Sequence, residues 1–596
     1  MSWTESHGFS TFGQYNLTLL GVDQAWLNIT NNLENQTLWL YELSKDCLGC
    51  PHVINHDVAA VKAGASKEII VSTKFPLNYR LERDGATEII RENENGGFIR
   101  NLHCQVDTSM GEFGIYELNA QEDGCEFVTV LKPVSIFLPF LIPFFFYLGL
   151  AAVIFILKKY KTQIFRAVGL GKKSNETDAV LAVSSVRTID KPTAPAPPAS
   201  KRLSALDTFR GISIVVMMFV HDGRAGYYFL DHATWDGLFV ADLVFPWFLW
   251  IMGVCIPVSI KSQVKRDTPK LTILKRIIIR SIKLIAIGIM LNSKGGPIEF
   301  ATLRLPGVLQ RFGICYFVTA TCVLICADKG CSNNNKPQNK YLAMVQDILI
   351  IWKGWVIVLA CVVLHTCLTF FLKVPGCPTG YLGPGGLHDG AKYPGECVGG
   401  ASGYIDRQIL TMNHIYQWPT AKGTYRSIAY DPEGLLGTLT SILTVWLGVQ
   451  VGLILQVYPK HKSRLIRWAI WAVVLGAIGA ALCGAKQTGG AIPLNKNLWS
   501  LSFVLVLSSF ALILLMVLYV TIDMLKIWSG TPFREPGMNS ILLYVAHLVM
   551  NDMLPFHFRL KTMNTHFKLL AESLWSISLW VIYAIYLFHK KFFWNL

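Results

Sequence analysis

Two histidines with acidic neighbours lie between the second and third apolar segments of the chain. Val220-His-Asp222 ends one segment, and Asp231-His-Ala-Thr-Trp-Asp236 begins ten residues after His221. The pKa of histidine lies near working pH, so a neutral imidazole can take a proton from a reacting amine. Asp231 and Asp236 are the carboxylates expected to orient the ring and stabilise its cation. His232, His221 and Asp231 are therefore candidate catalytic residues, of the kind that acyl transfer to an amine requires. Histidines at membrane interfaces also serve as structural hydrogen-bonding groups, and this alternative stays open.

A charged pair opens the segment that ends in His221. In Leu206-Asp-Thr-Phe-Arg-Gly211, Asp207 and Arg210 are three residues apart and share a helical face. The two side chains either pair and anchor the helix end, or Arg210 offers its guanidinium to a phosphate or carboxylate of a bound cofactor. In the second case Asp207 and Arg210 are both candidate cofactor-binding residues.

Further polar groups occur where apolar ones are expected. They lie in Asp431-Pro-Glu-Gly434, in Asn495-Lys-Asn-Leu-Trp-Ser500 and in Pro536-Gly-Met-Asn-Ser540, with His547 after the last. Each would cost several kcal/mol if it faced lipid. Hydrogen bonding between helices explains any one of them, but together they indicate a shared ligand cavity, with Asn497, Asn539 and Ser540 as candidate cofactor-binding residues.

The composition indicates a membrane protein. Of the 596 residues, 52% are apolar and 16% are charged, whereas soluble proteins carry roughly 25% charged residues. The net charge of +15 arises from Lys and Arg that recur between apolar segments, a pattern typical of membrane topology and not of a nucleic-acid-binding surface. Eleven segments approach the roughly 20 residues that a bilayer requires; they lie near 134–157, 208–221, 238–260, 274–292, 308–327, 346–372, 434–456, 466–483, 499–523, 536–553 and 573–589.

The sequence thus predicts a polytopic α-helical membrane protein with about eleven transmembrane helices. Residues 1–133, with alternating runs such as 67–73 and 126–131, form a small β-rich domain in this prediction. The segment 134–157 is the first transmembrane helix, 158–205 is a Pro-rich disordered linker, and 206–596 is a ten-helix domain. A cap loop at 373–433, rich in Gly, Pro and aromatics, covers the site.

Cysteines, sequons and basic loops give one orientation. Sequons at Asn16, Asn28 and Asn35 lie beside cysteines in polar stretches, which favours a lumenal or extracellular N-terminal domain. The basic loops near 158–173, 261–280, 460–464 and 590–591 fall on the opposite, cytosolic side together with the C-terminus. The cysteines that we expect in disulfides, with no metal site, are Cys47, Cys50, Cys104, Cys125, Cys377 and Cys397.

The chain resembles the lysosomal heparan-α-glucosaminide N-acetyltransferases over nearly its whole length. The resemblance lies in Leu206-Asp-Thr-Phe-Arg-Gly211, His232-Ala-Thr-Trp235, Ala241-Asp-Leu-Val-Phe-Pro-Trp-Phe248, Arg304-Leu-Pro-Gly-Val-Leu-Gln-Arg311, Cys377-Pro-Thr-Gly-Tyr-Leu-Gly-Pro-Gly-Gly386, Gly403-Tyr-Ile-Asp-Arg407, Tyr430-Asp-Pro-Glu-Gly434, Asn495-Lys-Asn-Leu-Trp-Ser-Leu501 and Pro536-Gly-Met-Asn-Ser-Ile541. It implies acetyl transfer from cytosolic acetyl-CoA to the terminal glucosamine of heparan sulfate, in a multi-pass lysosomal membrane protein that forms a homodimer. The family's active-site histidine falls on His232, either as nucleophile or as base.

The chain departs from the family pattern at two positions. His221 stands where better-known animal members have Asn, and Asp236 stands where Asn often follows the Trp. An Asp-x-x-Arg opening with a His fourteen residues after the Asp resembles bacterial membrane acyltransferases that act on other sugars. Three alternatives stay open: acyl transfer to a different sugar, a transporter or channel for a sugar or anion, and a glycan-binding scaffold anchored by its helices. No nucleotide-hydrolysis motif appears in a suitable context.

Overall fold

The structure, a computed structural model, describes residues 10–58, 60–83, 85, 87–90, 101–167, 203–294, 299–327, 344–486, 488–550, 553 and 565–594. The chain divides into two compact units. One comprises Met1–Val134 together with Ser204–Leu596, and the other is Ser135–Leu203.

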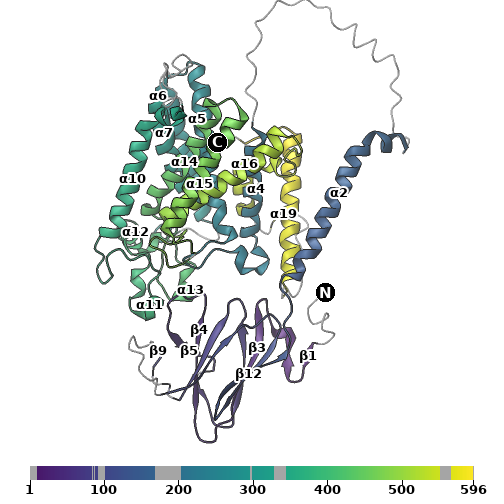
Figure 1. Cartoon of the computed structure of the whole chain (residues 1–596), viewed down its shortest axis with the longest axis vertical. Coiled ribbons are helices and arrows are strands. Elements are labelled where there is room, and N and C mark those ends of the chain that lie inside the picture. The colour runs from purple at the N-terminus through teal and green to yellow at the C-terminus, as the bar shows by residue number, and fades with distance from the viewer. Residues whose placement is uncertain are drawn as a thin grey trace, which may run out of the picture. The chain divides into compact units, whose positions relative to one another are not determined.

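The N-terminal region is rich in β-strands, as predicted, and its strands form a two-sheet sandwich (Figure 1). One sheet has the strand order β10-β8-β4-β5-β9, with β6 also paired to β4, and the other has the order β12-β11-β3-β7. The strands are β3 (Gln24–Asn31), β4 (Leu38–Ser44), β5 (His52–Ile54), β6 (Ala60–Val61), β7 (Ser66–Ser72), β8 (Leu77–Glu82), β9 (Ile89–Ile90), β10 (Leu102–Thr108), β11 (Ile115–Gln121) and β12 (Gly124–Leu131), preceded by the small hairpin β1 (Thr11–Phe12) and β2 (Tyr15–Asn16).

Apolar residues alternate along the strands, and their side chains fill the space between the two sheets. Leu27 and Ile29 of β3 and Leu38 and Leu40 of β4 are at most 1% exposed, and each such side chain contributes about 1.5–3 kcal/mol by leaving water. A disulfide between Cys104 in β10 and Cys125 in β12 links the outer strands of the two sheets.

The three predicted glycosylation sites differ in exposure. Asn35 is exposed and Asn16 is half-buried, but Asn28 lies in the inner strand β3 with a side chain that is 9% exposed. A glycan is bulky and needs a surface amide. In the folded domain the Asn28 side chain is thus largely shielded from solvent although its local sequence motif is intact, and glycosylation at Asn28 stays a prediction.

The second unit contains the first predicted membrane helix, α2 (Leu138–Ala167). Its apolar side chains are largely exposed, as expected for a helix that contacts lipid. The helix continues ten residues beyond the predicted end at 157, because Leu157-Lys-Lys-Tyr-Lys161 carries good helix formers and no proline or glycine. Most of the predicted linker, residues 168–202, lies outside the described residues.

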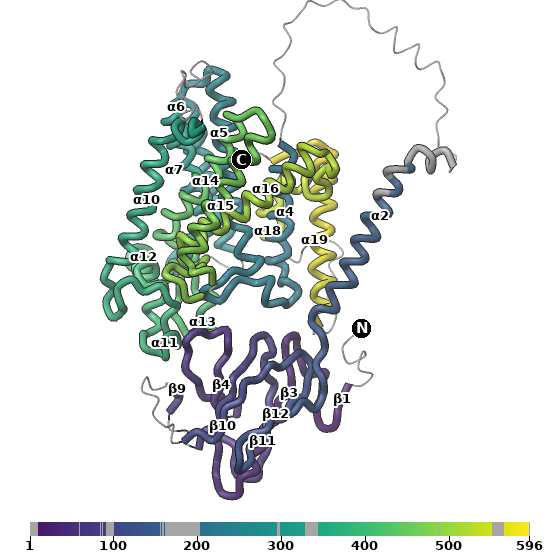
Figure 2. Tube along the Cα trace, viewed as in Figure 1, coloured from purple at the N-terminus to yellow at the C-terminus, as the bar shows by residue number. Residues whose placement is uncertain are grey.

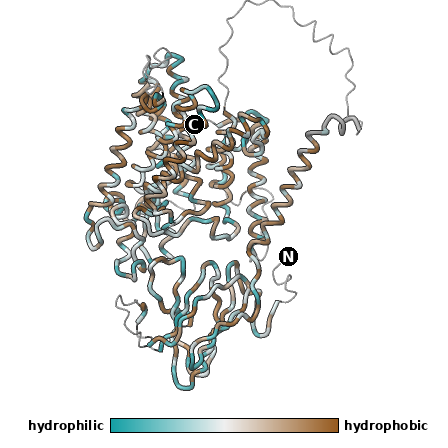
Figure 3. The backbone as a smooth tube through the Cα atoms, in the orientation of Figure 1, coloured by the Kyte–Doolittle hydropathy of each residue, from teal (hydrophilic) through white to brown (hydrophobic). Residues whose placement is uncertain are grey.

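The rest of the chain forms a helical bundle with a helix at every predicted membrane segment. Its long helices are α4 (Ser204–His221), α5 (Val240–Lys265), α6 (Lys270–Asn292), α7 (Val308–Cys326), α10 (Trp352–Phe371), α14 (Leu435–Val457), α15 (His461–Leu482), α16 (Leu501–Leu518), α18 (Ser540–Val549) and α19 (His566–His589). Eight helices within the described residues are long and apolar enough to cross a membrane, and Figure 3 shows their hydrophobic character. The predicted fold class, a polytopic helical membrane protein with an N-terminal β-domain, is confirmed.

Close helix contacts depend on glycine. A Cβ on Gly448 of α14 would lie 2.0 Å from the carbonyl oxygen of Trp250 in α5, and one on Gly253 would lie 2.0 Å from that of Val445. The tenth predicted segment is broken into the short helix α17 (Arg534–Met538) and α18. Here a Cβ on Gly537 would lie 1.8 Å from the Asp207 carbonyl oxygen, so α17 and α4 approach through bare backbone.

Two further features position the site. In Figure 2 the last helix, α19, lies beside α4, so the first and last helices of the bundle are in contact. Between α10 and α14 a cap contains α11 (His388–Ala391), α12 (Ala401–Leu410) and α13 (Ala421–Tyr425), and the Cys377–Cys397 disulfide closes part of it.

Candidate active site

The loop between α4 and α5 presents His232 with a fixed ring orientation. Its Nδ1 lies 2.7 Å from Oδ1 of Asp242, a residue of the first turn of α5 that is 1% exposed. The other oxygen of Asp242 accepts from the backbone N–H groups of Ala233 and Phe239, each at 3.1 Å. Because a carboxylate only accepts, Nδ1 carries the proton and Nε2 of neutral His232 has a lone pair. The ring is thus prepared to act as base or nucleophile.

Lys496 places a positive charge beside this ring. Its Nζ is 3.0 Å from Nδ1 and 3.1 Å from Nε2 of His232, and 4.0 Å from Oδ1 of Asp242. The loop before α16 that carries Lys496 is tied to the His232 loop, since Asn495 Nδ2 donates to Asp236 Oδ1 at 2.9 Å and Gly237 N donates to the Leu494 carbonyl at 2.8 Å. Imidazole, carboxylate and ammonium therefore come together from three segments.

The predicted carboxylate partners of His232 have other roles. Oδ1 of Asp231 accepts from the backbone N–H of His232 at 2.7 Å and forms an ion pair with Arg224 at 3.0 Å. Burial raises the pKa of Asp236 to about 6, partly offset by the hydrogen bond from Asn495. The structure thus corrects the expectation that Asp231 or Asp236 orients the imidazole: the loop folds back onto α5 and brings Asp242 to the ring instead.

His221 pairs with a second histidine and not with His232. Nδ1 of His221 is 2.8 Å from Nε2 of His547 in α18, and Nδ1 of His547 is 2.9 Å from the Leu543 carbonyl oxygen. Since a carbonyl only accepts, Nδ1 of His547 donates to it, and Nε2 of His547 must accept from Nδ1 of His221. Nε2 of neutral His221 is then an acceptor, on a side chain that is exposed.

His232 stands in the wall of an open cleft of about 670 Å³, here called the His232 cleft. Asp231, Thr234 and cap residues such as Thr424 form one wall, and the β-domain forms the other. The cleft carries charges of both signs, among them Asp46, Asp231, Lys74 and Arg426. A polar ligand with charged groups suits such a lining.

A separate cavity of about 410 Å³, here called the arginine cavity, runs between α4, α5, α6, α7 and α18. It extends along α5 from Phe245 to Gln263, eighteen residues at 1.5 Å each, about 27 Å. This is close to the roughly 30 Å of a bilayer's hydrocarbon core. Three guanidinium groups line it, those of Arg210, Arg276 and Arg280.

Two of the five predicted cofactor residues line the arginine cavity, Arg210 and Ser540. Arg210 Nη1 contacts Asp207 Oδ1 at 3.4 Å and the Gly537 carbonyl at 3.3 Å, and its Nη2 contacts Cys255 Sγ at 3.2 Å. The structure does not place Asn539 on the cavity: its amide holds the C-terminal backbone, donating to the Phe592 carbonyl at 2.8 Å and accepting from Trp594 N at 3.1 Å.

Asn497 also lies away from the arginine cavity. It follows Lys496 in the loop beside His232, where its carbonyl accepts from Tyr430 Oη at 2.8 Å. Both asparagines were assigned to the cofactor from their polarity within apolar surroundings, and that signal does not distinguish a ligand contact from a backbone contact.

Comparisons with known proteins identify the family of this chain. Residues 202–389 match a family model described as the catalytic domain of heparan-α-glucosaminide N-acetyltransferase. A human protein of that name is 40% identical over 97% of this chain and 88% of its own length, and a mouse protein of that name is 38% identical over 97% and 89%. The chain belongs to the heparan-α-glucosaminide N-acetyltransferase family.

Members of the heparan-α-glucosaminide N-acetyltransferase family are acetyltransferases, and this chain is a multi-pass membrane enzyme of that class. The matched catalytic region contains His232 and Asp242 together with the three arginines of the arginine cavity. Lys496 and His547 lie beyond it, in a part that the two relatives also cover.

Sequence reasoning missed a buried ion cluster between the loops that precede α7 and α14. Arg304 binds Asp431 through two nitrogens, at 2.8 and 2.7 Å, and Glu433 at 2.6 Å. Burial alone would lower the pKa of Arg304, but the two carboxylates outweigh it and raise that pKa. Burial would raise the pKa of Glu433, yet the positive charges of Arg304, Lys496 and Arg311 hold it below its ordinary value. The sequence did contain a signal for this cluster. Arg304 on one side, and Asp431 with Glu433 on the other, lie in motifs that carry charges next to an apolar segment.

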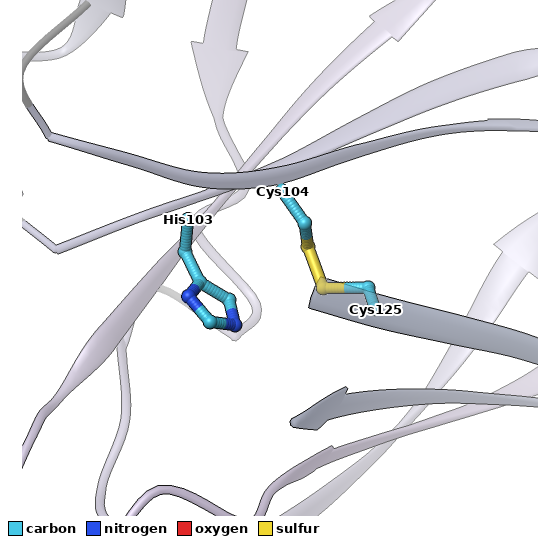
Figure 4. A group of neighbouring side chains, drawn as sticks. All are labelled: His103, Cys104 and Cys125. Atoms are coloured by element: carbon cyan, nitrogen blue, oxygen red, sulfur yellow. A yellow bond between two sulfur atoms is a disulfide. The ribbon is translucent and has the colours of Figure 1, made fainter. Parts of the chain in front are cut away.

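One group of potential metal ligands occurs within the described residues, and it is unsuited to a metal. A nitrogen of His103 and the sulfurs of Cys104 and Cys125 lie within 4.8 Å of one another. Figure 4 shows the two sulfurs bonded to each other. Metal ligation by cysteine needs a thiolate, so this disulfide is structural.

Proposed function

We propose that the enzyme transfers the acetyl group of acetyl-CoA, bound from the cytosolic side, to the amine of the terminal α-glucosamine of heparan sulfate in the lysosomal lumen. The observation that carries the proposal is the pairing of two sites along the same helices. The arginine cavity reaches from Gln263 to Phe245 along α5, and His232 is fixed by Asp242 at the start of that helix.

The arginine cavity suits the donor. Acetyl-CoA has phosphate groups at one end and a thioester at the end of a long, thin arm, and guanidinium groups bind phosphate through several hydrogen bonds. Arg276 and Arg280 come from the first half of α6, whereas Phe245 and Tyr544 line the other end of the cavity. The phosphates would bind near the arginines, with the thioester toward the α5 start.

His232 suits the acceptor amine. In a ternary complex Nε2 takes a proton from the glucosamine nitrogen as that nitrogen attacks the thioester carbonyl, the C–S bond breaks, and the thiolate of CoA leaves. If an acetyl-enzyme forms instead, the same Nε2 is the nucleophile. In either case Asp242 stabilises the charged imidazole, and the ammonium of Lys496 can stabilise negative charge on the carbonyl oxygen.

His221 lies on the donor side of the site, where the lone pair of its Nε2 can accept a hydrogen bond from an amide N–H of the long arm of CoA. The ring of His221 contacts that of Tyr544, a residue lining the arginine cavity, with centroids 6.4 Å apart, and its Nδ1 is bonded to His547. This assigns His232 to the acceptor and His221 to the donor side. Asp231 would act through Arg224 and the backbone of His232, as a positioning residue.

Charge and covalent chemistry support one orientation in the membrane. Basic residues at Lys261–Arg280, Lys460–Arg464 and Lys590–Lys591 favour the cytosol for the end where the phosphates would bind. Three disulfides and the exposed sequon at Asn35 favour the lumen for the β-domain and the cap. The lysosomal location and assembly as a homodimer are part of the proposal and rest on the family resemblance.

The test uses membranes that contain the enzyme or its His232→Ala variant, with acetyl-CoA and a fluorogenic α-glucosaminide. Wild-type membranes should acetylate the amine, and the variant should lose at least about 100-fold in turnover, the lower range for removing a general base. Binding of acetyl-CoA should persist in the variant, which shows that the bundle is folded. Near-normal turnover by the variant would overturn the assignment of His232.

A further inference from the structure

The β-domain supplies most of the His232 cleft. Fifteen of the twenty-three residues that line the cleft belong to it, from Glu42–Asp57 and Ser72–Phe75. The other eight are Asp231, His232, Thr234, Leu387, Thr420, Gly423, Thr424 and Arg426. His232 thus faces a wall that is formed by the β-sandwich and not by the helical bundle.

This wall is held firmly against the catalytic loop. Oδ2 of Asp46 accepts from the hydroxyl of Thr234, two residues after His232, at 2.7 Å. Tyr425 Oη donates to the Asp46 carbonyl at 3.2 Å and accepts from Leu48 N at 3.1 Å. The Cys47–Cys50 disulfide closes the loop that makes these contacts. Such fixed geometry is typical of a binding surface and not of a loose gap between domains.

The cleft is lined by acidic side chains on both walls and by two basic ones. The acidic side chains are Glu42, Asp46, Asp57 and Asp231, and the basic ones are Lys74 and Arg426. Asp231 is adjacent to His232, and Asp46 accepts a hydrogen bond from Thr234. Both carboxylates therefore lie next to the loop that carries His232. Lys74 follows β7, and Arg426 follows α13 in the cap. Arg426 pairs with Glu88 at 2.8 Å, but the two side chains are 45% and 57% exposed, so the pair is weak and a ligand anion can replace it.

We propose that the β-domain and the cap form a second binding subsite, in which Lys74 and Arg426 hold the anionic groups of the sugars that precede the terminal glucosamine. The inference rests on the function proposed above and names how the same site recognises a chain. A terminal glucosamine carries an ammonium, which suits the acidic surroundings of His232, whereas its neighbours in the chain carry carboxylate or sulfate. The 670 Å³ cleft lies within the roughly 300–1,000 Å³ that is typical of ligand-binding pockets.

The experiment compares two acceptors that end in the same α-glucosamine. One is a fluorogenic glucosaminide with an uncharged leaving group, and the other is a heparan-derived oligosaccharide. KM and kcat for each are measured in membranes with the full-length enzyme and with Lys74→Gln, Arg426→Gln and the double variant. Desulfated and carboxyl-reduced oligosaccharides then separate sulfate from carboxylate as the bound group.

The double variant should raise KM for the oligosaccharide about tenfold, as expected for loss of two partly exposed charged contacts, and leave KM for the glucosaminide unchanged. Lys62→Gln, at an exposed β-domain lysine outside the cleft, is the matched control and should change neither. Added salt should raise the oligosaccharide KM of wild type more than that of the double variant. An equal rise for both acceptors, or no rise for either, would overturn the subsite. Failure of wild type to acetylate either acceptor would instead refute the proposed function.

Discussion

Asp242→Asn should abolish most of the activity while keeping the fold, because it moves the ring proton of His232 from Nδ1 to Nε2. In the native protein Oδ2 of Asp242 accepts from two backbone N–H groups, those of Ala233 and Phe239, and Oδ1 accepts from His232. An asparagine has one oxygen and one NH2 group for these three donors. Turning the NH2 toward Ala233 and Phe239 would leave two buried N–H groups unpaired, at about 1–3 kcal/mol each.

The asparagine oxygen should therefore face the backbone, and its NH2 should face His232. Nδ1 of His232 must then accept, so the ring proton moves to Nε2, the atom that has to take the amine proton. The same reversal in the Ser-His-Asp triad lowers kcat about 10⁴-fold. General-base catalysis is worth about 10²–10⁴-fold, which at 1.36 kcal/mol per tenfold is about 2.7–5.4 kcal/mol of barrier. We expect a fall of kcat in this range for Asp242→Asn.

The assay is acetylation of a fluorogenic glucosaminide at saturating acetyl-CoA, with the amount of folded enzyme in each membrane preparation measured by acetyl-CoA binding. Asp236→Asn is the matched control, because its oxygen can still accept from Asn495 and it does not contact the imidazole. The control should retain activity within a few-fold of wild type. If Asp242→Asn keeps kcat within tenfold of wild type while binding acetyl-CoA normally, the carboxylate does not set the tautomer and the reasoning fails.

Two further predictions concern the donor and the pH dependence of stability. Arg280→Gln should weaken acetyl-CoA binding about tenfold, because a charge-assisted hydrogen bond to phosphate is lost. Arg266 is exposed and lies outside the arginine cavity, so Arg266→Gln should leave acetyl-CoA binding unchanged. Equal dissociation constants of acetyl-CoA for the two variants would contradict the assignment. Burial raises the pKa of Asp406 to about 7 from its ordinary 3.8, although a hydrogen bond from Leu435 N opposes this. The stability that Asp406 contributes is thus fully present below about pH 4 and is lost as pH rises through about 7, at most about 4 kcal/mol. Tm measured from pH 4 to 8 should fall less steeply for Asp406→Asn than for wild type, and parallel curves would contradict this.

The membrane segments were predictable because hydropathy is a local property. Each predicted segment contains a helix, and the errors lie at ends, where Lys158–Ala167 extends α2 and Asn539 separates α17 from α18. The end of a helix depends on capping and on contacts with other segments, which composition does not report. Alternating residues likewise indicated β7 and β12, but the pairing order of the strands required the structure.

The members of the site were predictable as residue types, but their partners were not. His232 was found from its neighbours in sequence. Its carboxylate, Asp242, lies ten residues away and reaches the ring because the intervening loop folds back, with the N–H groups of Ala233 and Phe239 both bound to the other oxygen of Asp242. Lys496 comes from a segment 264 residues distant. Contacts over such distances follow from tertiary packing, and one sequence carries no direct signal for them.

The glycine contacts of the bundle have a genetic consequence. Every single-base change in a glycine codon that alters the residue adds at least a Cβ or ends translation, and at Gly211, Gly253, Gly448 and Gly537 that carbon would meet a backbone oxygen at 1.6–2.0 Å. Backbone cannot rotate aside as a side chain does, so the helices must separate. In a population or a mutational scan, such variants should reduce the amount of enzyme in the membrane, while changes at His232 leave the amount intact and remove its turnover. Abundance and activity measured side by side would therefore sort inherited variants of this chain into two mechanistic classes.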